Sequence, residues 1–314
     1  MELREGIVIC STGSWYTVRI AKGEVVKARI KGKFRLYGIK TTNPVSVGDR
    51  VLLEPKPNDE NMITEILPRK NYIIRKSVNL SKQAHIIASN IDQALLIVTI
   101  ASPSTSTGFI DRFLVTTEAY HIPVTIVFNK IDIYTEKEKL KLDELLALYK
   151  GIGYNCLTIS AINNQGIDTI KELMHDKVTL LSGHSGVGKS TMVNAIDSSL
   201  DLKTANVSDS HHKGKHTTTF AEMFELDMGG FIIDTPGIKG FGLVDFEKED
   251  LAHYFVEMRP LMVDCKFNNC QHIKEPKCGV KKALENKTLA ESRYQNYVSM
   301  WNDDQQESYR NLSY

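Results

Sequence analysis

The residues from Gly183 to Ser190 read Gly-His-Ser-Gly-Val-Gly-Lys-Ser, which is the pattern of a phosphate-binding loop. Glycines let backbone N–H groups converge on phosphate oxygens, and a helix opening at Thr191 would add positive potential. Lys189 would neutralise the β- and γ-phosphates, and the Ser190 hydroxyl would ligate Mg²⁺. The motif predicts a nucleotide-phosphate site formed by Gly183, His184, Ser185, Gly186, Val187, Gly188, Lys189, Ser190 and Thr191.

A second motif, Asn-Lys-Ile-Asp at residues 129–132, directly follows the apolar run 124–128. The Asp132 carboxylate can accept hydrogen bonds from both N1–H and N2–H₂ of guanine, a pair of donors that adenine does not offer. The Lys130 stem can lie over the base, and Asn129 can brace neighbouring loops. Alone, the motif is also compatible with a polar strand exit, but beside a phosphate loop it predicts a guanine nucleotide.

Two further strand ends are expected at the same site. Ser160 and Ala161 end another apolar run, which would place the Ala161 N–H near guanine O6. Residues 231–237 read Phe-Ile-Ile-Asp-Thr-Pro-Gly, so Asp234 would hold the Mg²⁺ shell and the Gly237 N–H would sense the γ-phosphate. Asp-x-x-Gly is a weak turn signal in isolation and a strong one beside a phosphate loop.

Residues 207–219 form a polar stretch that ends in Gly-Lys-His-Thr-Thr-Thr. A segment that carries threonine hydroxyls fits a switch loop that orders around Mg²⁺ and the γ-phosphate, although without the neighbouring motifs a plain surface loop would be preferred. The expected magnesium ligands are Ser190 and Thr218, and Thr217 and Thr219 stay open as alternatives to Thr218.

The order of the motifs is unusual, because in most GTPases the phosphate loop precedes Asn-Lys-x-Asp, whereas here residues 129–132 precede residues 183–190. This order predicts circular permutation, with the same strands in the sheet and the chain ends in a different loop. Apolar runs alternate with helix-like stretches such as 135–150. We therefore expect parallel βαβ units, with helices on both faces and each motif at the carboxyl end of its strand.

The N-terminal region has strand-like runs at residues 6–10, 15–20 and 50–54. Within 27–35, basic residues take the odd positions and apolar residues take most of the even ones, which predicts a strand with a cationic outer face. Residues 19–40 carry eight basic residues and one acid, a net charge of +7. Such short strands predict a small β-barrel of the oligonucleotide-binding (OB) type. Nucleic-acid contact is favoured over an ordinary solvated sheet face.

Whole-chain averages hide this segregation, because the 314 residues contain 39 Lys plus Arg and 38 Asp plus Glu. The length predicts about two or three domains. Hydrophobic residues make up 42% and charged residues 25%, which excludes wholesale disorder. The apolar run 94–101 is too short to span a bilayer, and the first residues lack the apolar stretch of a secretory signal. We expect a cytoplasmic protein whose five cysteines are reduced.

Three cysteines and one histidine gather in the C-terminal region as Cys265, Cys270, His272 and Cys278. Three thiolates and one imidazole at this spacing suit a closed tetrahedral Zn²⁺ site, which predicts one structural zinc ion rather than unrelated thiols. Six residues of the helix-like tail are either RNA contacts or, as we favour, part of an amphipathic docking face: Lys277, Lys281, Lys282, Arg293, Tyr294 and Tyr297.

The permuted motifs, the basic N-terminal barrel and His-Thr-Thr-Thr at residues 216–219 together resemble the ribosome small-subunit-dependent GTPase A (RsgA) family over essentially the whole chain. The resemblance implies an OB-fold RNA-binding domain at 1–72, a circularly permuted GTPase domain at 73–243 and a zinc domain at 244–314. It also implies GTP hydrolysis stimulated by the small ribosomal subunit, contact with its rRNA and a role in late maturation of that subunit. We expect a monomer.

Many GTPases place a water-orienting Gln directly after Asp-x-x-Gly, but here that position is Ile238. His216 is the first candidate for the missing group, because it lies in the expected switch and resembles the family's catalytic histidine. Weaker candidates are His184, His211 and His212. Lys189 and Mg²⁺ would stabilise charge during in-line attack of water on the γ-phosphate. Two alternatives stay open: an ATP-dependent nucleic-acid enzyme and a nonenzymatic RNA-binding module with a structural nucleotide.

Overall fold

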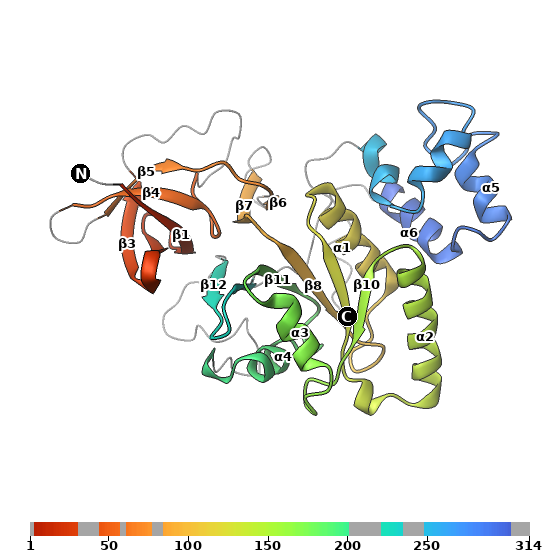
Figure 1. Cartoon of the computed structure of the whole chain (residues 1–314). Coiled ribbons are helices and arrows are strands. Elements are labelled where there is room, and N and C mark those ends of the chain that lie inside the picture. Colours follow the sequence, from red (N-terminus) through yellow and green to blue (C-terminus); the bar gives the residue numbers. More distant parts are fainter. Residues whose placement is uncertain are drawn as a thin grey trace.

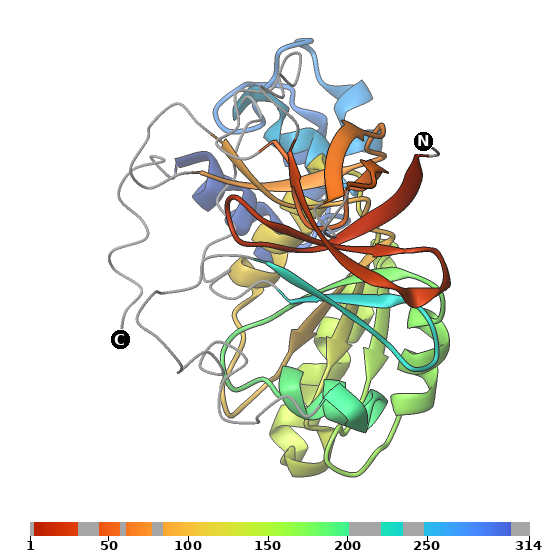
Figure 2. The ribbon, with the colours of Figure 1, turned by 90° about the vertical axis from the view of Figure 1, so that its left-hand side faces the viewer.

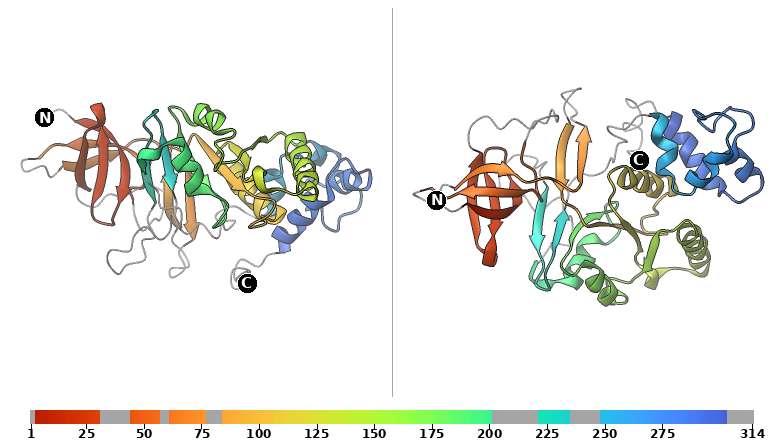
Figure 3. Two further views of the ribbon diagram at one scale, coloured as in Figure 1. Left: turned by 90° about the horizontal axis from the view of Figure 1, so that it is seen from below. Right: turned by 45° about the horizontal axis from the view of Figure 1, so that its top comes forward.

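The computed structural model describes residues 3–30, 44–56, 61–76, 84–200, 221–234 and 248–302. Along the chain, an N-terminal barrel is followed by a sheet that helices cover and then by a helical C-terminal region (Figure 1). The barrel and the C-terminal region lie at opposite ends of the molecule (Figure 3). None of the helices within the described ranges is both long enough and apolar enough to cross a membrane.

Five strands of the described N-terminal ranges close into the predicted barrel. β1 pairs with β2 and β4, β2 with β3, β3 with β5, and β5 with β4, so the ring is complete. Only the β3–β5 pair among these is parallel. Side chains such as Tyr16, Leu53 and Ile63 fill its interior. The strands are β1 (Arg4–Ser11), β2 (Tyr16–Ile20), β3 (Val25–Ile30), β4 (Arg50–Glu54) and β5 (Asn61–Ile66).

The expected alternation along β3 is confirmed for its described residues. Lys27 and Arg29 are exposed, and Ala28 between them is buried. The Arg29 guanidinium lies over the Trp15 ring, 3.7 Å from its centroid, which is a cation–π contact on the outer face. The later basic residues of this segment lie outside the described residues: Lys31, Lys33, Arg35 and Lys40.

The central sheet has the strand order β10-β9-β8-β11-β13-β12. β12 is antiparallel to β13, and the other neighbouring pairs are parallel. Leu95 and Leu96 of β8 belong to different cores, one covered by α3 and α4 and the other by α1 and α2, so helices cover both faces as predicted. The strands are β8 (Gln93–Val98), β9 (Val124–Phe128), β10 (Asn155–Thr158), β11 (Val178–Ser182), β12 (Glu222–Glu225) and β13 (Phe231–Asp234). The helices are α1 (Thr107–Ala119), α2 (Glu136–Gly151), α3 (Ile167–Met174) and α4 (Lys189–Ile196).

The barrel is joined to the central sheet through β12. β1 pairs antiparallel with β12 at Cys10 and Glu222, so the two sheets are continuous (Figure 2). Beside this pair, Arg19 of β2 forms an ion pair with Glu225 and lies over the Phe231 ring at 5.3 Å. One face of the barrel therefore contacts both strands of the β12–β13 hairpin.

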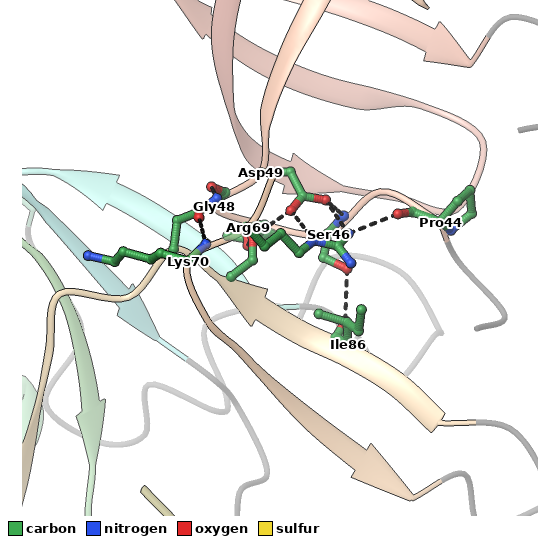
Figure 4. Close-up of polar contacts among 10 residues, drawn as sticks. Pro44, Ser46, Gly48, Asp49, Arg69, Lys70 and Ile86 are labelled. Atoms are coloured by element: carbon green, nitrogen blue, oxygen red, sulfur yellow. Dashed lines mark hydrogen bonds and ion pairs between the residues drawn. The ribbon is translucent and has the colours of Figure 1, made fainter. Parts of the chain in front are cut away.

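A buried ion pair forms a second joint between the barrel and the rest of the chain (Figure 4). Arg69 donates two hydrogen bonds of 2.6 Å to the Asp49 carboxylate, whose side chain has no exposed area. Ser89, the last residue of the β7 strand (Ala84–Ser89), donates a third bond of 2.6 Å to Asp49. β7 pairs with β6 (Tyr72–Lys76) in a separate hairpin. Because charges are buried only with partners, this cluster holds the barrel against β7.

The C-terminal region packs on α1 through a second buried charge network. Arg293 lies 2.7 Å from Asp111 of α1 and 2.6 Å from Glu257, and Asn296 donates to Asp111 at 2.6 Å. Arg293 and Asp111 have no exposed side-chain area. Its described residues, 248–302, form two 3₁₀ segments, η5 (Lys248–Tyr254) and η6 (Arg259–Asp264), and two helices, α5 (Gly279–Glu285) and α6 (Glu291–Asn302).

Candidate functional site

The predicted phosphate loop connects β11 to α4, which is the strand–loop–helix context that its chemistry requires. Gly183 and Gly188 have φ angles of 146° and 95°. A Cβ at Gly183 would lie 2.3 Å from the Ile97 carbonyl oxygen, and one at Gly188 would lie 2.4 Å from Nδ2 of Asn129. Glycine is therefore required at both positions, because the loop backbone packs directly on the ends of β8 and β9.

The other loop residues follow from this path. Ser185 and Gly186 are exposed, Val187 and Ser190 are buried, and Thr191 lies in the first turn of α4. Each of these residues was predicted to contribute to the phosphate site, and the structure places them on one continuous loop and helix start.

Lys189 reaches back across the loop from the first position of α4. Its ammonium donates to the carbonyl oxygens of Gly183 at 2.6 Å and His184 at 2.8 Å. The His184 ring stacks on Phe109 of α1, with ring centroids 3.8 Å apart. Burial, and then the charge of Lys189, lower the pKa of His184, so its ring is neutral at neutral pH. The loop therefore presents a single cation, Lys189, beside a neutral stacked imidazole.

Asn129 joins the predicted base motif to the phosphate loop. Its side-chain N–H donates to the Val187 carbonyl oxygen at 2.8 Å, and its side-chain oxygen accepts from the Ala161 N–H at 3.1 Å. Asn129 is 1% exposed, and Ser160 is fully buried beside it. Three segments far apart in sequence therefore meet on one amide side chain.

Lys130 and Asp132 extend from the same strand end. Lys130 has a left-handed backbone, with φ of 67°, and its ammonium donates to the Ser102 carbonyl oxygen at 2.6 Å. Asp132 is exposed in the 3₁₀ turn η3 (Ile131–Ile133). The lysine stem and the carboxylate thus lie on the exposed side of the loop, where a base has access to them.

The segment that follows β8, which includes Ser102 and Pro103, belongs to the site although no sequence motif marked it. Ser102 accepts from Lys130, and a Cβ at Gly186 would come within 3.4 Å of Pro103. The segment therefore lines the site between the two predicted motifs. A signal for it exists, since the polar run 102–107 follows an apolar strand, and ligands of open α/β sheets bind at the carboxyl ends of strands.

The expected switch residues His216 and Thr218 and the expected γ-phosphate sensor Gly237 lie outside the described residues. Of Asp234, the structure describes the backbone, which pairs with Leu181 in the parallel β11–β13 ladder. The strand that carries the predicted magnesium-shell residue is thus the immediate neighbour of the strand that enters the phosphate loop.

The four predicted metal ligands lie together: the donor atoms of Cys265, Cys270, His272 and Cys278 are all within 4.8 Å of one another. Nδ1 of His272 lies 3.5 Å from the Cys265 sulfur and 3.3 Å from the Cys278 sulfur, and these two sulfurs are 3.9 Å apart. With a Zn–S length of about 2.3 Å, tetrahedral geometry separates donors by roughly 3.5–3.8 Å. The cluster fits one tetrahedral metal ion, with Nδ1 of His272 as the nitrogen ligand.

The surrounding backbone supports anionic sulfur. The N–H of Gly279 donates to the Cys265 sulfur at 3.3 Å, and the N–H of Lys281 donates to the Cys278 sulfur at 3.4 Å. Burial raises the pKa of the Cys270 thiol to about 12. Thiolates in this environment therefore require a cation between them, as metal ligation supplies.

The α6 tyrosines hold the metal cluster in place. The Tyr294 hydroxyl donates to the His272 carbonyl oxygen at 2.8 Å, and the Tyr297 hydroxyl donates to that of Gln271 at 2.7 Å. Tyr294, Tyr297 and Arg293 are all buried. These three residues therefore form a docking face, as favoured, and not a surface for RNA.

The arrangement defines a class of protein. The phosphate loop follows β11, the guanine motif follows β9, and Ser-Ala follows β10 of a parallel sheet; these features define a P-loop GTPase domain. Because β9 precedes β11 in the chain, this domain is circularly permuted. Residues 66–244 match the family model described as RsgA GTPase, and residues 5–63 match the RsgA N-terminal domain. The chain belongs to the RsgA GTPase family, as its sequence indicated.

Curated and solved relatives agree over nearly the whole chain. It is 54% identical to "Small ribosomal subunit biogenesis GTPase RsgA" of Bacteroides fragilis, covering 98% of this chain and 99% of the relative. The crystal structure of YjeQ from Thermotoga maritima has a TM-score of 0.76 at 38% identity and covers 96% of this chain and 98% of its own. The crystal structure of YloQ, "a circularly permuted GTPase", has a TM-score of 0.74 at 32% identity, with coverage of 96% and 94%.

Proposed function

We propose that this GTPase binds the small ribosomal subunit during late maturation of that subunit and hydrolyses GTP to GDP and phosphate. Binding to the small subunit stimulates the hydrolysis. The relative from Bacteroides fragilis is named for biogenesis of the small subunit, which supports the partner. The observation that carries the nucleotide part is the bridge from Asn129 to Val187 and Ala161, which joins phosphate and base motifs in one site. The exposed Lys27 and Arg29 of β3 offer rRNA a cationic face.

Base and phosphate are assigned to different strand ends. Asp132 accepts from guanine N1–H and N2–H₂, and the Lys130 stem lies over the base. The Ala161 N–H, which donates to the Asn129 side-chain oxygen in the structure, would have to share or exchange that bond to reach O6. The backbone of residues 183–188 and the Lys189 ammonium hold the phosphates. The residues proposed for the magnesium ion and the γ-phosphate end of the site are Ser190, Thr218, Asp234 and Gly237. Mg²⁺ when bound supplies charge neutralisation at the phosphates.

We assign the water-orienting role to His216, since Ile238 occupies the position where many GTPases carry Gln. His216→Ala should retain GTP binding and lose hydrolysis that depends on the small subunit. Full stimulated turnover in this variant would remove His216 from the mechanism.

The remaining assignments are also proposals, which the family and, for the metal, the cluster geometry support. We infer that the metal is one structural Zn²⁺ ion, held by the three cysteines and His272. We also infer domain limits at 1–72, 73–243 and 244–314, contact with rRNA of the small subunit, a monomeric chain and a cytoplasmic location, where ribosomal subunits mature.

The decisive experiment measures GTP hydrolysis with and without purified small ribosomal subunits. The proposal expects slow turnover alone and strong stimulation by small subunits, but not by large subunits. Competition by GDP but not ADP separates it from an ATP-dependent nucleic-acid enzyme. Nucleotide binding without turnover in the presence of small subunits would instead support an RNA-binding module with a structural nucleotide.

A further inference from the structure

The base loop, residues 129–134, is held by one buried side chain outside the guanine motif. Tyr134 is 6% exposed, although Ile133 just before it is 52% exposed. The Tyr134 hydroxyl donates to the Asn129 carbonyl oxygen at 2.5 Å and accepts from the Ile100 N–H at 2.9 Å. These partners follow β9 and β8, which are neighbouring parallel strands. Tyr134 therefore ties the far end of the loop to the ends of both strands.

The bond to Asn129 holds the peptide that leads into Lys130. A left-handed conformation such as that of Lys130 is costly for a residue other than glycine, and it persists only where the surroundings hold it. The Asn129 side chain is already bonded to Val187 and Ala161. Its carbonyl group is thus held separately by the Tyr134 hydroxyl, which closes the loop.

The bond from Ile100 holds the opposite side of the same loop. Two residues after Ile100, the Ser102 carbonyl oxygen accepts the Lys130 ammonium. One hydroxyl thus fixes both segments that Lys130 connects. Burial raises the pKa of Tyr134, so the hydroxyl keeps the proton that it donates. A capping box at Thr135 then starts α2 and fixes the direction in which the chain leaves the loop.

We propose that Tyr134 is a positioning residue for guanine recognition, whose hydroxyl holds residues 129–134 so that Asp132 meets both N1–H and N2–H₂ of the base. The proposal rests on the proposed GTP binding and adds a determinant of base discrimination outside Asn-Lys-x-Asp. Two hydrogen bonds to one carboxylate require both oxygens to be aimed, so their combined contribution depends on the orientation of the loop. Loosening the loop should reduce discrimination between guanine and hypoxanthine, which lacks the 2-amino group.

Tyr134→Phe removes the hydroxyl and keeps the ring. Tyr154→Phe is a matched control, because the Tyr154 hydroxyl is buried and has no hydrogen-bond partner among the described residues. Calorimetric titration of each variant with GDP and with IDP measures the two affinities. We expect Tyr134→Phe to weaken GDP binding roughly three- to tenfold and IDP binding less, so that the ratio of the two dissociation constants moves toward one. The KM for GTP should rise while kcat at saturation stays within about twofold.

The control and the ratio make the outcomes distinct. Tyr154→Phe should keep both affinities at the wild-type values. An unchanged ratio of GDP to IDP affinity in Tyr134→Phe, whatever its melting temperature, would overturn the proposal, because a purely structural hydroxyl affects both nucleotides equally. Wild-type protein that binds ADP as tightly as GDP would overturn the proposed function itself, so the two failures are separable.

Discussion

Replacing Arg293 with methionine should detach α6 from α1, because its guanidinium neutralises the buried Asp111 carboxylate and the largely buried Glu257 carboxylate. Arg293 and Asp111 have no exposed side-chain area, and the Glu257 side chain is 11% exposed. The contacts are 2.7 Å to Asp111 and 2.6 Å to Glu257, and the guanidinium also lies over the Phe255 ring at 4.6 Å. Methionine fills much of the same volume without the charge.

The magnitude follows from burial. At an effective dielectric constant of about 20, each contact of this length contributes about 6 kcal/mol of Coulomb energy, most of which the desolvation of the charges offsets. Removing one partner leaves that desolvation cost uncompensated, and the expected loss is about 3–5 kcal/mol. This is a large part of the roughly 5–15 kcal/mol that stabilises a typical domain.

Hydrogen exchange of the α6 amides measures this loss locally, without requiring the whole chain to unfold in one step. Arg259→Met is the matched control, because the Arg259–Glu118 ion pair also connects the C-terminal region to α1 but is 47% and 27% exposed. An exposed pair contributes less than about 1 kcal/mol. We expect α6 exchange to accelerate by more than roughly a hundredfold in Arg293→Met and by less than about fivefold in the control.

The loss should also depend on pH. Burial raises the pKa of Asp111 above its ordinary value of 3.8, and Arg293 opposes this shift. Without Arg293, folded Asp111 binds a proton that the unfolded chain has released, so stability falls as pH rises from the ordinary value through the raised pKa. The loss of stability caused by Arg293→Met should be smaller at about pH 5 than at about pH 8. Adding Asp111→Asn to the Arg293→Met chain should recover part of the lost stability. A pH-independent deficit, or one below about 1 kcal/mol, would refute the reasoning.

Gly188→Ala should abolish GDP binding in calorimetric titration, because the new Cβ would lie 2.4 Å from Nδ2 of Asn129. Retained affinity would show that the phosphate loop can shift to accept the Cβ, which would contradict the requirement for glycine. Asn129→Ala should weaken GDP binding roughly ten- to a hundredfold, since it leaves the Val187 carbonyl group without this partner, and a smaller effect would contradict the bridging role. Cys270→Ser should lower the zinc content from about one ion per chain, whereas Cys156→Ser should leave the zinc content unchanged. Elemental mass spectrometry measures the zinc content of each variant. Equal zinc in both variants would contradict the assigned ligands.

The parts predicted from the sequence are those with a local signal. The phosphate loop, the guanine motif and the metal ligands each lie within a short segment, so residue type and spacing identify them. The strand alternation that predicts the barrel is likewise local, and β3 shows it at Lys27, Ala28 and Arg29. Placing the motifs in one site needed the further rule that the carboxyl ends of parallel strands share one edge of the sheet.

Long-range polar contacts could not be predicted in this way. Asp111 looks like an ordinary charged residue of an amphipathic helix, and its partner Arg293 lies in a helix near the other end of the chain. The pairing of Asp49 with Arg69, at the joint between the barrel and the sheet, could not be predicted for the same reason. Tyr134 carries no motif, and its role depends on the distance between two strand ends. In each case the signal lies in three-dimensional position and not in residue type.

The pairing of β1 with β12 has a consequence for folding in the cell. Without the barrel, β12 would be the outermost strand of the central sheet, and its free N–H and C=O groups would be a template for pairing with another chain. Chains fold from the N-terminus as they are synthesised, so the barrel that contains β1 is complete before β12 leaves the ribosome. Because the barrel precedes β12 in the chain, the strand that pairs with β12 at Glu222 is already synthesised when β12 forms.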